Sequence, residues 1–333
     1  MRVAINGLGR IGRLVLRAVF EQYRNDVEVV AVNDLMDIDT FLHLFKYDSV
    51  HGKFSCAVKK TATNRFSIND HEIEYLSQGD LKDLHWSKFD VDLVMECSGK
   101  FKDRKDCSAH INNGAKKVLL SCPGKDFDKT IIFGVNNDQL TKEDIFVSNG
   151  SCTTNCLATV VKVIHSEFGI ASGTVSTIHS YTRDQYLVDS FHKDLRRARA
   201  GAINIIPTNT GSAVAIGDIF PELKGKLLCQ AFRVPIENVS LIDCCFSVEK
   251  DITELAAKNA IINWADFKIG NGVLQYTEEE LVSSDFNHSA CSACVDLPLL
   301  KVINSNCLKI IAWYDNEWGF ANRMLDNACL MFR

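Results

Sequence analysis

Two residues of this 333-residue chain have the types and settings needed for covalent catalysis. Cys152 stands in the segment SCTTNC (residues 151–156), at the predicted start of a helix. A helix N-terminus stabilises an anion, so this position can lower the pKa of a thiol and make it a nucleophile toward an aldehyde carbon. His179 ends a predicted strand, and an imidazole near its usual pKa takes and returns a proton at neutral pH. Cysteine and histidine are also common packing residues, and position in the sequence alone does not decide between the two interpretations.

Groups suited to binding a phosphate follow the histidine. Hydroxyls, a glycine backbone and guanidinium groups are what phosphate recognition requires. A solvated basic loop has the same composition, so both alternatives stay open at this point. The residues concerned are Thr182, Asp184, Arg196, Arg197, Arg199, Thr208, Thr210, Gly211 and Arg233.

A dinucleotide fingerprint opens the chain. Gly7, Gly9 and Gly12 form GxGxxG between a predicted strand and a predicted helix. The first glycine allows a tight turn, the second lets a pyrophosphate approach the backbone, and the third lets the helix pack closely. Asp34 ends the next strand about 20 residues later, where a carboxylate accepts hydrogen bonds from ribose hydroxyls and repels a 2′-phosphate. This order predicts NAD rather than NADP, although groups from another loop could still accommodate the 2′-phosphate.

Short apolar runs alternate with helical patterns in the first half of the chain. A continuous apolar run such as 27–33 indicates a strand buried on both faces of a parallel sheet. The alternation therefore predicts an α/β fold with a Rossmann doubly wound parallel sheet. The predicted strands are 2–6, 27–33, 91–96, 117–121, 131–135 and 144–148, and the predicted helices are 13–21 and 104–112.

The pattern changes after about residue 150. The later strands alternate and are rich in β-branched residues, which is typical of a mostly antiparallel sheet covered on one side. We therefore expect an NAD-binding domain at residues 1–150 and an α+β catalytic domain at residues 151–316, with a C-terminal helix at 317–333 packed back on the first. The predicted elements are a helix at 154–168, strands at 173–179, 232–235, 239–249 and 308–314, and a long polar loop at 184–209.

Composition excludes several classes of partner. Lys+Arg 37 against Asp+Glu 42 leaves a net charge of −5, so no nucleic acid is expected. No apolar run reaches the roughly 18 residues of a membrane span, and the N-terminus lacks a signal-peptide pattern, so we expect a cytoplasmic protein. The 13 cysteines are odd in number and scattered, and the CxxC at Cys291 and Cys294 has no second pair nearby. We predict neither a disulfide framework nor a metal site.

Several longer motifs resemble the glyceraldehyde-3-phosphate dehydrogenase family. They run in order and at family spacings from Arg2 to about Asp326, and SCTTNC is the most specific of them. The matching motifs are AINGLGRIGR, SNGSCTTNC, HSYT, DLRRARA, NIIPTNTG, FRVP and WYDNEWG.

The resemblance implies a role for each matched residue. Cys152 would be the nucleophile and His179 the base. The residues matching the site of the substrate's C3 phosphate are Thr182, Arg197 and Arg233, with Asp184 beside them. Those matching the site of attacking inorganic phosphate are Ser151, Thr153, Thr210 and Gly211. Asn316 matches the residue that fixes the nicotinamide carboxamide, and further cofactor contacts match Arg10, Ile11, Ser98, Gly99 and Ser121.

The implied reaction is the phosphorylating oxidation of glyceraldehyde 3-phosphate to 1,3-bisphosphoglycerate, with hydride transfer to NAD. Members of the family are usually homotetramers.

The nearest competitor is the erythrose-4-phosphate dehydrogenase branch, which the segments VSSDFNH and WGFANRMLD resemble. That branch tends to lose the groups present here as Thr182 and Thr210-Gly211, so we favour the glyceraldehyde substrate. A semialdehyde or acyl-phosphate reductase would not be expected to combine SCTTNC with HSYT and TNTG. Intact Cys152, His179 and Asn316 argue against a catalytically idle binding protein.

Overall fold

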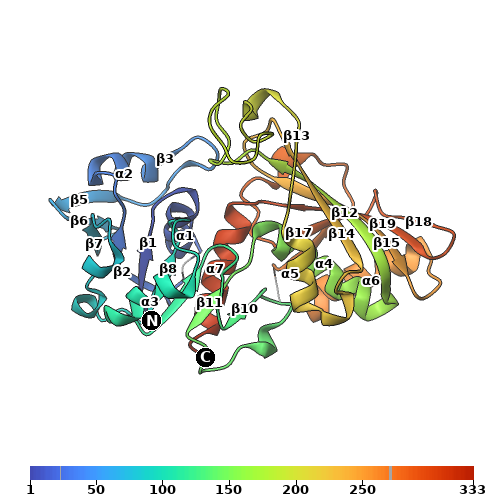
Figure 1. Cartoon of the computed structure of the whole chain (residues 1–333), viewed down its shortest axis with the longest axis horizontal. Coiled ribbons are helices and arrows are strands. Elements are labelled where there is room, and N and C mark those ends of the chain that lie inside the picture. Colours follow the sequence, from blue (N-terminus) through green and yellow to red (C-terminus); the bar gives the residue numbers. More distant parts are fainter. Residues whose placement is uncertain (23, 270–271) are drawn as a thin grey trace. The chain divides into compact units, whose positions relative to one another are not determined.

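The computed structural model describes residues 1–22, 24–269 and 272–333. The chain divides into two compact units, one of residues 1–151 with 320–333 and the other of residues 152–319. Figure 1 colours both along the sequence. Within the described ranges, no helix is both long enough and apolar enough to cross a membrane.

The first unit is built on a nine-stranded sheet within the described residues. Its order is β10 (Lys129–Thr130), β11 (Phe146–Ser148), β9 (Lys117–Leu120), β8 (Leu93–Glu96), β1 (Arg2–Asn6), β2 (Glu28–Asn33), β7 (His71–Leu76), β6 (Arg65–Ile68) and β5 (Val58–Ala62). Neighbours from β10 to β7 pair in parallel, whereas β5 and β6 add antiparallel strands at one edge. The central strands are buried on both faces, which explains their nearly continuous apolar sequences.

The helices of the first unit are α1 (Arg10–Glu21), α2 (Ile38–Lys46), α3 (Arg104–Asn112) and most of α7 (Trp318–Leu330), and a small hairpin joins β3 (Tyr47–Asp48) to β4 (Gly52–Lys53). The side chain of Asn327 on α7 donates to Asn149 Oδ1 at 2.6 Å and to Ile131 O at 2.9 Å. β1 lies between β2 and β8, so the strand order reverses there (Figure 1). Ligands of doubly wound folds bind beyond the carboxyl ends of the strands at such a reversal.

The second unit contains a mixed, mostly antiparallel sheet. Its order is β13 (Ile206–Thr208), β14 (Leu227–Val234), β12 (Ile170–Ser180), β15 (Ser240–Val248), β19 (Cys307–Tyr314), β17 (Ala293–Asp296) and β16 (Leu274–Thr277), with β18 (Lys301–Ile303) paired to β19. Only the pairs β12–β14 and β16–β17 are parallel among these described strands.

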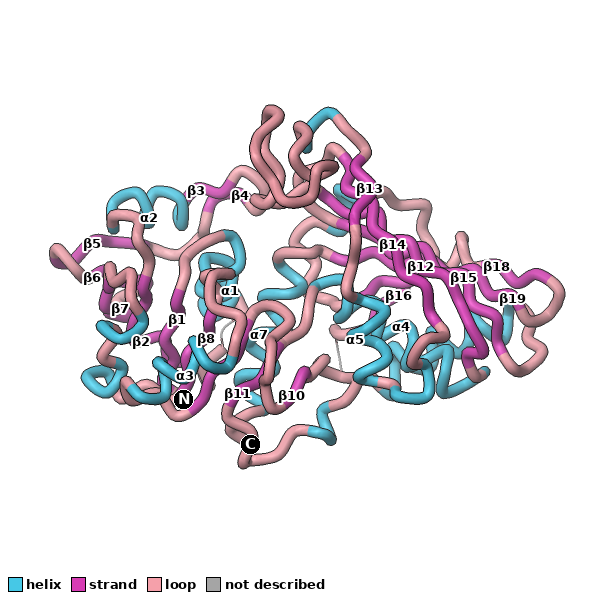
Figure 2. Tube along the Cα trace, in the orientation of Figure 1, coloured by secondary structure: helices cyan, strands magenta, loops and turns pink. Residues whose placement is uncertain are grey.

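Helices cover one face of this second sheet, as Figure 2 shows. They are α4 (Cys152–Phe168), α5 (Ser212–Ile219) and α6 (Glu254–Asn263). Along β15 the residues alternate strictly between buried and half-buried, and α4 contacts β15, β17 and β19. Short single turns lie at Leu81–Asp83, Trp86–Phe89, Asn137–Gln139, Gly201–Ile203, Pro221–Leu223, Trp264–Lys268 and Ser283–Phe286.

The predicted fold class is confirmed, one predicted strand is wrong, and the predicted loop at 184–209 contains a short strand, β13, near its end. Residues 131–135 form no strand, because only Lys129–Thr130 pairs with β11. Ile131 and Ile132 are buried, which explains the apolar run, but the chain turns at Gly134 with a φ of +84°. The side chain of Asn136 closes this turn by accepting from Ile132 N at 2.8 Å. Elsewhere the bounds differ slightly, as in α1, which begins at Arg10 rather than at residue 13.

Candidate active site

Helix α4 and strand β12 bring Cys152 and His179 together. Cys152 is the first residue of α4 and is half-buried, whereas His179 lies at the end of β12 with only 4% of its surface exposed. The Sγ atom of Cys152 lies 3.5 Å from Nε2 of His179. A proton can therefore pass from the thiol to the imidazole.

The hydrogen bond of the other ring nitrogen determines which form of the imidazole is present. Nδ1 of His179 lies 2.7 Å from the carbonyl oxygen of Ser180. A carbonyl oxygen only accepts, so Nδ1 carries the proton in this bond. Nη1 of Arg233, 2.9 Å from Nδ1, also only donates, and in this tautomer it bonds to Ser180 O at 3.0 Å and not to Nδ1. Nε2 then presents its lone pair to the sulfur of Cys152, which is the tautomer that a general base needs.

Burial sets the charge state of this pair. Burial lowers the pKa of His179 to about 3, and the positive charge of Arg233 acts in the same direction. Burial also raises the pKa of the Cys152 thiol, although Arg233 and the backbone N–H of Thr153 oppose that shift. The sequence-based expectation of a lowered thiol pKa and a histidine near its usual pKa is therefore wrong for this state, because desolvation outweighs the helix N-terminus. The resting pair is a neutral thiol and a neutral imidazole.

Arg233 lies directly beside the base. Strands β12 and β14 pair in parallel with His179 opposite Arg233. Nη1 of Arg233 lies 3.0 Å from Ser180 O, 2.9 Å from Nδ1 of His179 and 3.4 Å from Thr182 Oγ1. The Nε atom of Arg233 is buried and has no hydrogen-bond partner within the described residues. A guanidinium with an unused buried donor suits an anion.

A second arginine lies within electrostatic range of this group. Arg197 donates from Nε to Thr208 Oγ1 and from Nη1 to Asp184 Oδ2, both at 2.7 Å. Asp184 also contacts Nε2 of His192 at 3.2 Å. The charge of Arg197 contributes to lowering the pKa of His179, so the two arginines act on the same region. The predicted groups around Thr182, Asp184, Arg197 and Arg233 therefore surround a positively charged site.

The residues predicted for attacking phosphate are less closely connected. Thr210 Oγ1 bonds to Ser212 Oγ at 2.8 Å, and Gly211 precedes α5 with nothing within 4 Å of an added Cβ. Within the described chain, no hydrogen bond joins Thr210 or Gly211 to Cys152 or His179. Ser151 is half-buried just before the cysteine, and Thr153 follows it in the first turn of α4.

Tyr314 was missed by the sequence analysis. Its Oη lies 2.9 Å from Thr153 Oγ1 and 2.9 Å from Thr177 Oγ1, and Thr177 in turn donates to Leu241 O at 3.2 Å. The ring of Tyr314 packs edge-on against His179 with centroids 6.1 Å apart. Tyr314 therefore fixes the start of α4 against β12. Its place in the motif WYDNEWG was the available signal, but the motif does not show what the hydroxyl contacts.

Asn316 is also held firmly. Its Oδ1 accepts from Ser180 Oγ at 3.0 Å and from Ser240 Oγ at 2.9 Å. Both hydrogen bonds end on the carbonyl oxygen, so the Nδ2 amide group of Asn316 is the part of the side chain that can donate hydrogen bonds to a ligand. The two serines were not predicted, because they lie far from Asn316 in the sequence.

The candidate cofactor residues of the first unit lie at one edge of its sheet. Asn6 pairs with Asn33 and with Glu96, and Glu96 pairs with Leu120, all in parallel register. The carboxyl ends of four strands therefore align. The residues that follow these ends are Gly7, Gly9, Arg10, Ile11, Gly12, Asp34, Ser98, Gly99 and Ser121.

The glycine loop tests whether a dinucleotide fits here. Gly7 has a φ of +92°, and an added Cβ would lie 2.4 Å from the backbone of Ser98. At Gly12 an added Cβ would lie 1.9 Å from Gly7 O, so the helix packs on the loop as the fingerprint requires. Gly9 precedes α1 with no side-chain cap, and the first turn of α1 has no acidic residue. These features leave the helix N-terminus suited to a pyrophosphate.

Acidic residues organise the rest of this edge. Asp34 accepts from Leu8 N at 2.6 Å and from Met36 N at 3.0 Å, and its oxygens retain further lone pairs for ribose hydroxyls. Arg10 forms an ion pair with Asp48. Burial is the largest single effect and raises the pKa of Asp48, but the hydrogen bond and charge of Arg10 and the backbone N–H groups of His51 and Val50 together outweigh it and lower that pKa to about 2. The residues present fit NAD.

Glu96 was not predicted, although it supports the same loops. Its carboxylate is fully buried and accepts from Ser98 N at 2.8 Å, from Asn6 Nδ2 at 2.5 Å and from the His110 ring at 3.1 Å. Trp86 donates to the other nitrogen of His110 at 3.0 Å. This network fixes the ends of β1 and β8.

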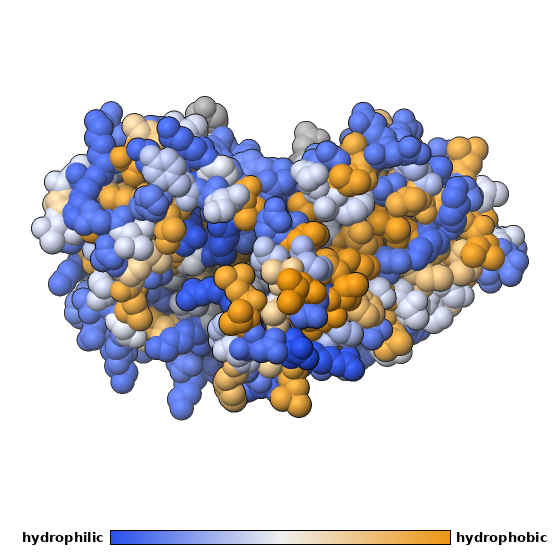
Figure 3. All heavy atoms as spheres, turned by 90° about the horizontal axis from the view of Figure 1, so that it is seen from above, coloured by the Kyte–Doolittle hydropathy of each residue, from blue (hydrophilic) through white to orange (hydrophobic). Residues whose placement is uncertain are grey.

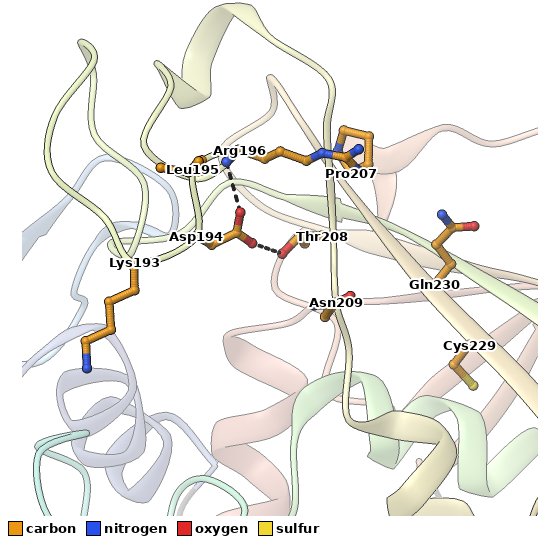
Figure 4. Close-up of a pocket in the computed structure, with 9 residues that line it drawn as sticks. All are labelled: Lys193, Asp194, Leu195, Arg196, Pro207, Thr208, Asn209, Cys229 and Gln230. Atoms are coloured by element: carbon orange, nitrogen blue, oxygen red, sulfur yellow. Dashed lines mark hydrogen bonds between the residues drawn. The ribbon is translucent and has the colours of Figure 1, made fainter.

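The polar loop at 184–209 borders a separate cavity of about 630 Å³. Figure 4 shows Asp194 between the backbone nitrogen of Arg196 (2.9 Å) and Thr208 Oγ1 (3.0 Å). Neither Cys152 nor His179 lines this cavity. Across the part of the chain that is described, no group of three or more His, Cys, Asp or Glu residues is arranged to hold a metal ion.

The buried neutral imidazole predicts an acid-dependent loss of stability. The unfolded chain protonates His179 near its usual pKa of about 6.5, whereas the folded chain does so near 3. Stability therefore falls as the pH drops below about 6.5, by roughly 1.4 kcal/mol per pH unit. Between pH 7 and pH 5, wild type should lose roughly 2 kcal/mol more than His179→Gln in urea unfolding. The exposed His43 supplies the control His43→Gln, which should behave as wild type. Equal losses in wild type and His179→Gln would contradict the assignment.

Comparison with known proteins identifies the family. The family model of the glyceraldehyde 3-phosphate dehydrogenase NAD binding domain matches residues 1–104, and that of the C-terminal domain matches residues 151–316. The chain is 48% identical to glyceraldehyde-3-phosphate dehydrogenase of Cereibacter sphaeroides over 100% of this chain and 99% of that protein. It is 48% identical to the chromosomal glyceraldehyde-3-phosphate dehydrogenase of Cupriavidus necator and 46% identical to the glyceraldehyde-3-phosphate dehydrogenase of Geobacillus stearothermophilus. Each of these two matches covers 98% of this chain and 97% of the relative. The chain belongs to the glyceraldehyde-3-phosphate dehydrogenase family.

Proposed function

We propose that this protein is an NAD-dependent, phosphorylating glyceraldehyde-3-phosphate dehydrogenase. The observation that carries the proposal is the 3.5 Å contact between Cys152 Sγ and His179 Nε2, beside two arginines suited to a phosphorylated substrate. The names of the relatives favour glyceraldehyde 3-phosphate over the erythrose-4-phosphate alternative.

In the first half of the reaction, Cys152 attacks the aldehyde carbon. His179 Nε2 takes the thiol proton as the carbon–sulfur bond forms and passes it to the carbonyl oxygen, which gives a thiohemiacetal on Cys152 and leaves the imidazole neutral again. Arg233, Thr182 and Arg197 bind the C3 phosphate and hold the carbon at the sulfur. A phosphate bound at Arg233 also neutralises the charge that weakens His179 as a base, so substrate binding itself strengthens the base.

In the second half, His179 accepts the hydroxyl proton and the thiohemiacetal becomes a thioester. NAD, when bound, supplies the acceptor for the hydride that leaves this carbon. Inorganic phosphate, which we assign to Ser151, Thr153, Thr210 and Gly211, then attacks the thioester carbon. His179 returns its proton to the leaving sulfur of Cys152, and 1,3-bisphosphoglycerate forms.

We assign NAD binding to the first unit and catalysis to the second. Gly7, Gly9 and Gly12 would receive the pyrophosphate and Asp34 the adenosine ribose. Asn316 would donate its amide N–H to the nicotinamide carboxamide. The remaining contacts are assigned to Arg10, Ile11, Ser98, Gly99 and Ser121.

We further propose a cytoplasmic homotetramer. Hydrophobic atoms gather on part of the surface in the right half of Figure 3. Large exposed apolar patches mark association surfaces in soluble proteins. Six apolar residues of the loop before β13 are more than two-thirds exposed and would supply such a surface. They are Leu187, Val188, Phe191, Leu195, Ile203 and Ile205. Sedimentation equilibrium tests the oligomeric state.

Cys152→Ser should abolish NAD reduction with glyceraldehyde 3-phosphate and phosphate while leaving NAD binding nearly unchanged, because a hydroxyl is a far weaker nucleophile than a thiol. Cys156→Ala, one turn further along α4, is the matched control and should retain activity. In wild type, turnover should require inorganic phosphate. Turnover of Cys152→Ser above a trace would contradict the nucleophile, and phosphate-independent oxidation of erythrose 4-phosphate would contradict the proposed substrate.

Arg233→Ala should raise KM for glyceraldehyde 3-phosphate roughly tenfold or more, since a hydrogen bond to a charged group contributes about 1.5–3 kcal/mol. Oxidation of unphosphorylated glyceraldehyde should change much less, which separates phosphate binding from the effect on His179. Arg199→Ala is the control, because this exposed arginine pairs with Asp189. Unaltered kinetics for Arg233→Ala with the phosphorylated substrate would count against the anion site.

A further inference from the structure

Two cysteines distant from Cys152 in the sequence lie against each other in the second sheet. The sulfur atoms of Cys245 on β15 and Cys307 on β19 are 3.4 Å apart, so one thiol donates a hydrogen bond to the other. The strands pair antiparallel, with Cys245 opposite Lys309 and Ser247 opposite Cys307. The two cysteines are therefore diagonal neighbours on one face of the sheet.

This face is the one that α4 does not cover. Along β15 the buried residues, such as Cys244, alternate with half-buried residues, such as Cys245. Cys307 is half-buried as well. Both cysteines are thus partly exposed in the single chain, whereas the neighbouring Cys244 is fully buried.

Charges flank the pair on the same face. Lys309 and Asp243 form an ion pair across the two strands. Burial and the adjacent thiol of Cys307 raise the pKa of Cys245, and the ammonium group of Lys309 opposes this shift. The carboxylate of Asp243 raises that pKa as well, so the thiolate that oxidation requires forms as the pH rises, and we expect the reaction to be faster at alkaline pH.

We propose that Cys245 and Cys307 form a reversible disulfide with each other when hydrogen peroxide oxidises them. The thiolate of one cysteine attacks a peroxide oxygen, the O–O bond breaks, and a sulfenic acid and one hydroxide form, the latter protonated to water. The second thiol then attacks the sulfenic sulfur, the S–S bond forms, and a second water leaves. The two sulfurs together give two electrons to one peroxide. The sulfur atoms need to approach from 3.4 Å to the roughly 2.05 Å of a disulfide.

The test is peptide mapping of the full-length protein after treatment with hydrogen peroxide and alkylation of the remaining thiols. Trypsin releases residues 234–250, which contain Cys244 and Cys245, and residues 302–309, which contain Cys307. Wild type should give a disulfide-linked pair of these peptides that dithiothreitol separates. The linked pair should persist in Cys244→Ala and in Cys229→Ser, a half-buried cysteine of β14.

The linked pair should be lost in Cys245→Ser and in Cys307→Ser. The proposal is overturned if wild type gives no linked pair at a peroxide dose that oxidises Cys152. It is also overturned if sulfinic acid forms at Cys245 or Cys307 in place of the disulfide. Persistence of the link in Cys245→Ser would transfer the pairing to Cys244 and would also overturn it. Because the wild-type map alone can refute the proposal, the test does not depend on the folding of the variants. It is equally independent of the proposed dehydrogenase activity.

Discussion

The contact between a sulfur and an imidazole nitrogen at the end of one strand is the constraint on which the site depends. Cys152 and His179 belong to different elements, so their 3.5 Å separation holds only while the start of α4 and the end of β12 stay in register. Tyr314 provides this restraint from β19 through its bonds to Thr153 and Thr177. The mixed sheet of the second unit thus sets the geometry of the proposed chemistry.

The same site has an electrostatic cost. Burial favours a neutral thiol and a neutral imidazole, and Arg233 further disfavours a charged imidazole. A phosphorylated substrate that binds Arg233 would remove part of this cost at the moment when the base is needed. We infer that the arginine has two linked effects, one on substrate binding and one on the basicity of His179. A site with this coupling would remain unreactive until its substrate is bound.

The sequence predicted the fold well where burial leaves a distinct pattern. The run at 27–33 predicted a strand, because strands of a parallel sheet are covered on both faces. The run at 131–135 failed because apolar sequence reports burial but not pairing, and Asn136 there closes a turn. The helix at 104–112 has the predicted bounds, with Asp103 capping its first turn.

The candidate site was predicted as a set of residues rather than as an arrangement. Motifs indicated Cys152, His179 and Arg233, but the contact of Arg233 with Ser180 O arises from strand pairing across 53 residues. The role of Tyr314 depends on three elements that meet only in the fold. The direction of both pKa shifts depends on burial, which a sequence does not contain.

The rate at which iodoacetamide alkylates Cys152 as a function of pH tests the central claim most directly, because it reports thiolate formation at one atom. If His179 takes the proton of Cys152 during the attack, His179→Asn should lower the rate at neutral pH, where the thiol predominates, and leave it nearly unchanged at alkaline pH, where the thiolate forms without a base. A profile for His179→Asn that coincides with that of wild type would contradict the account.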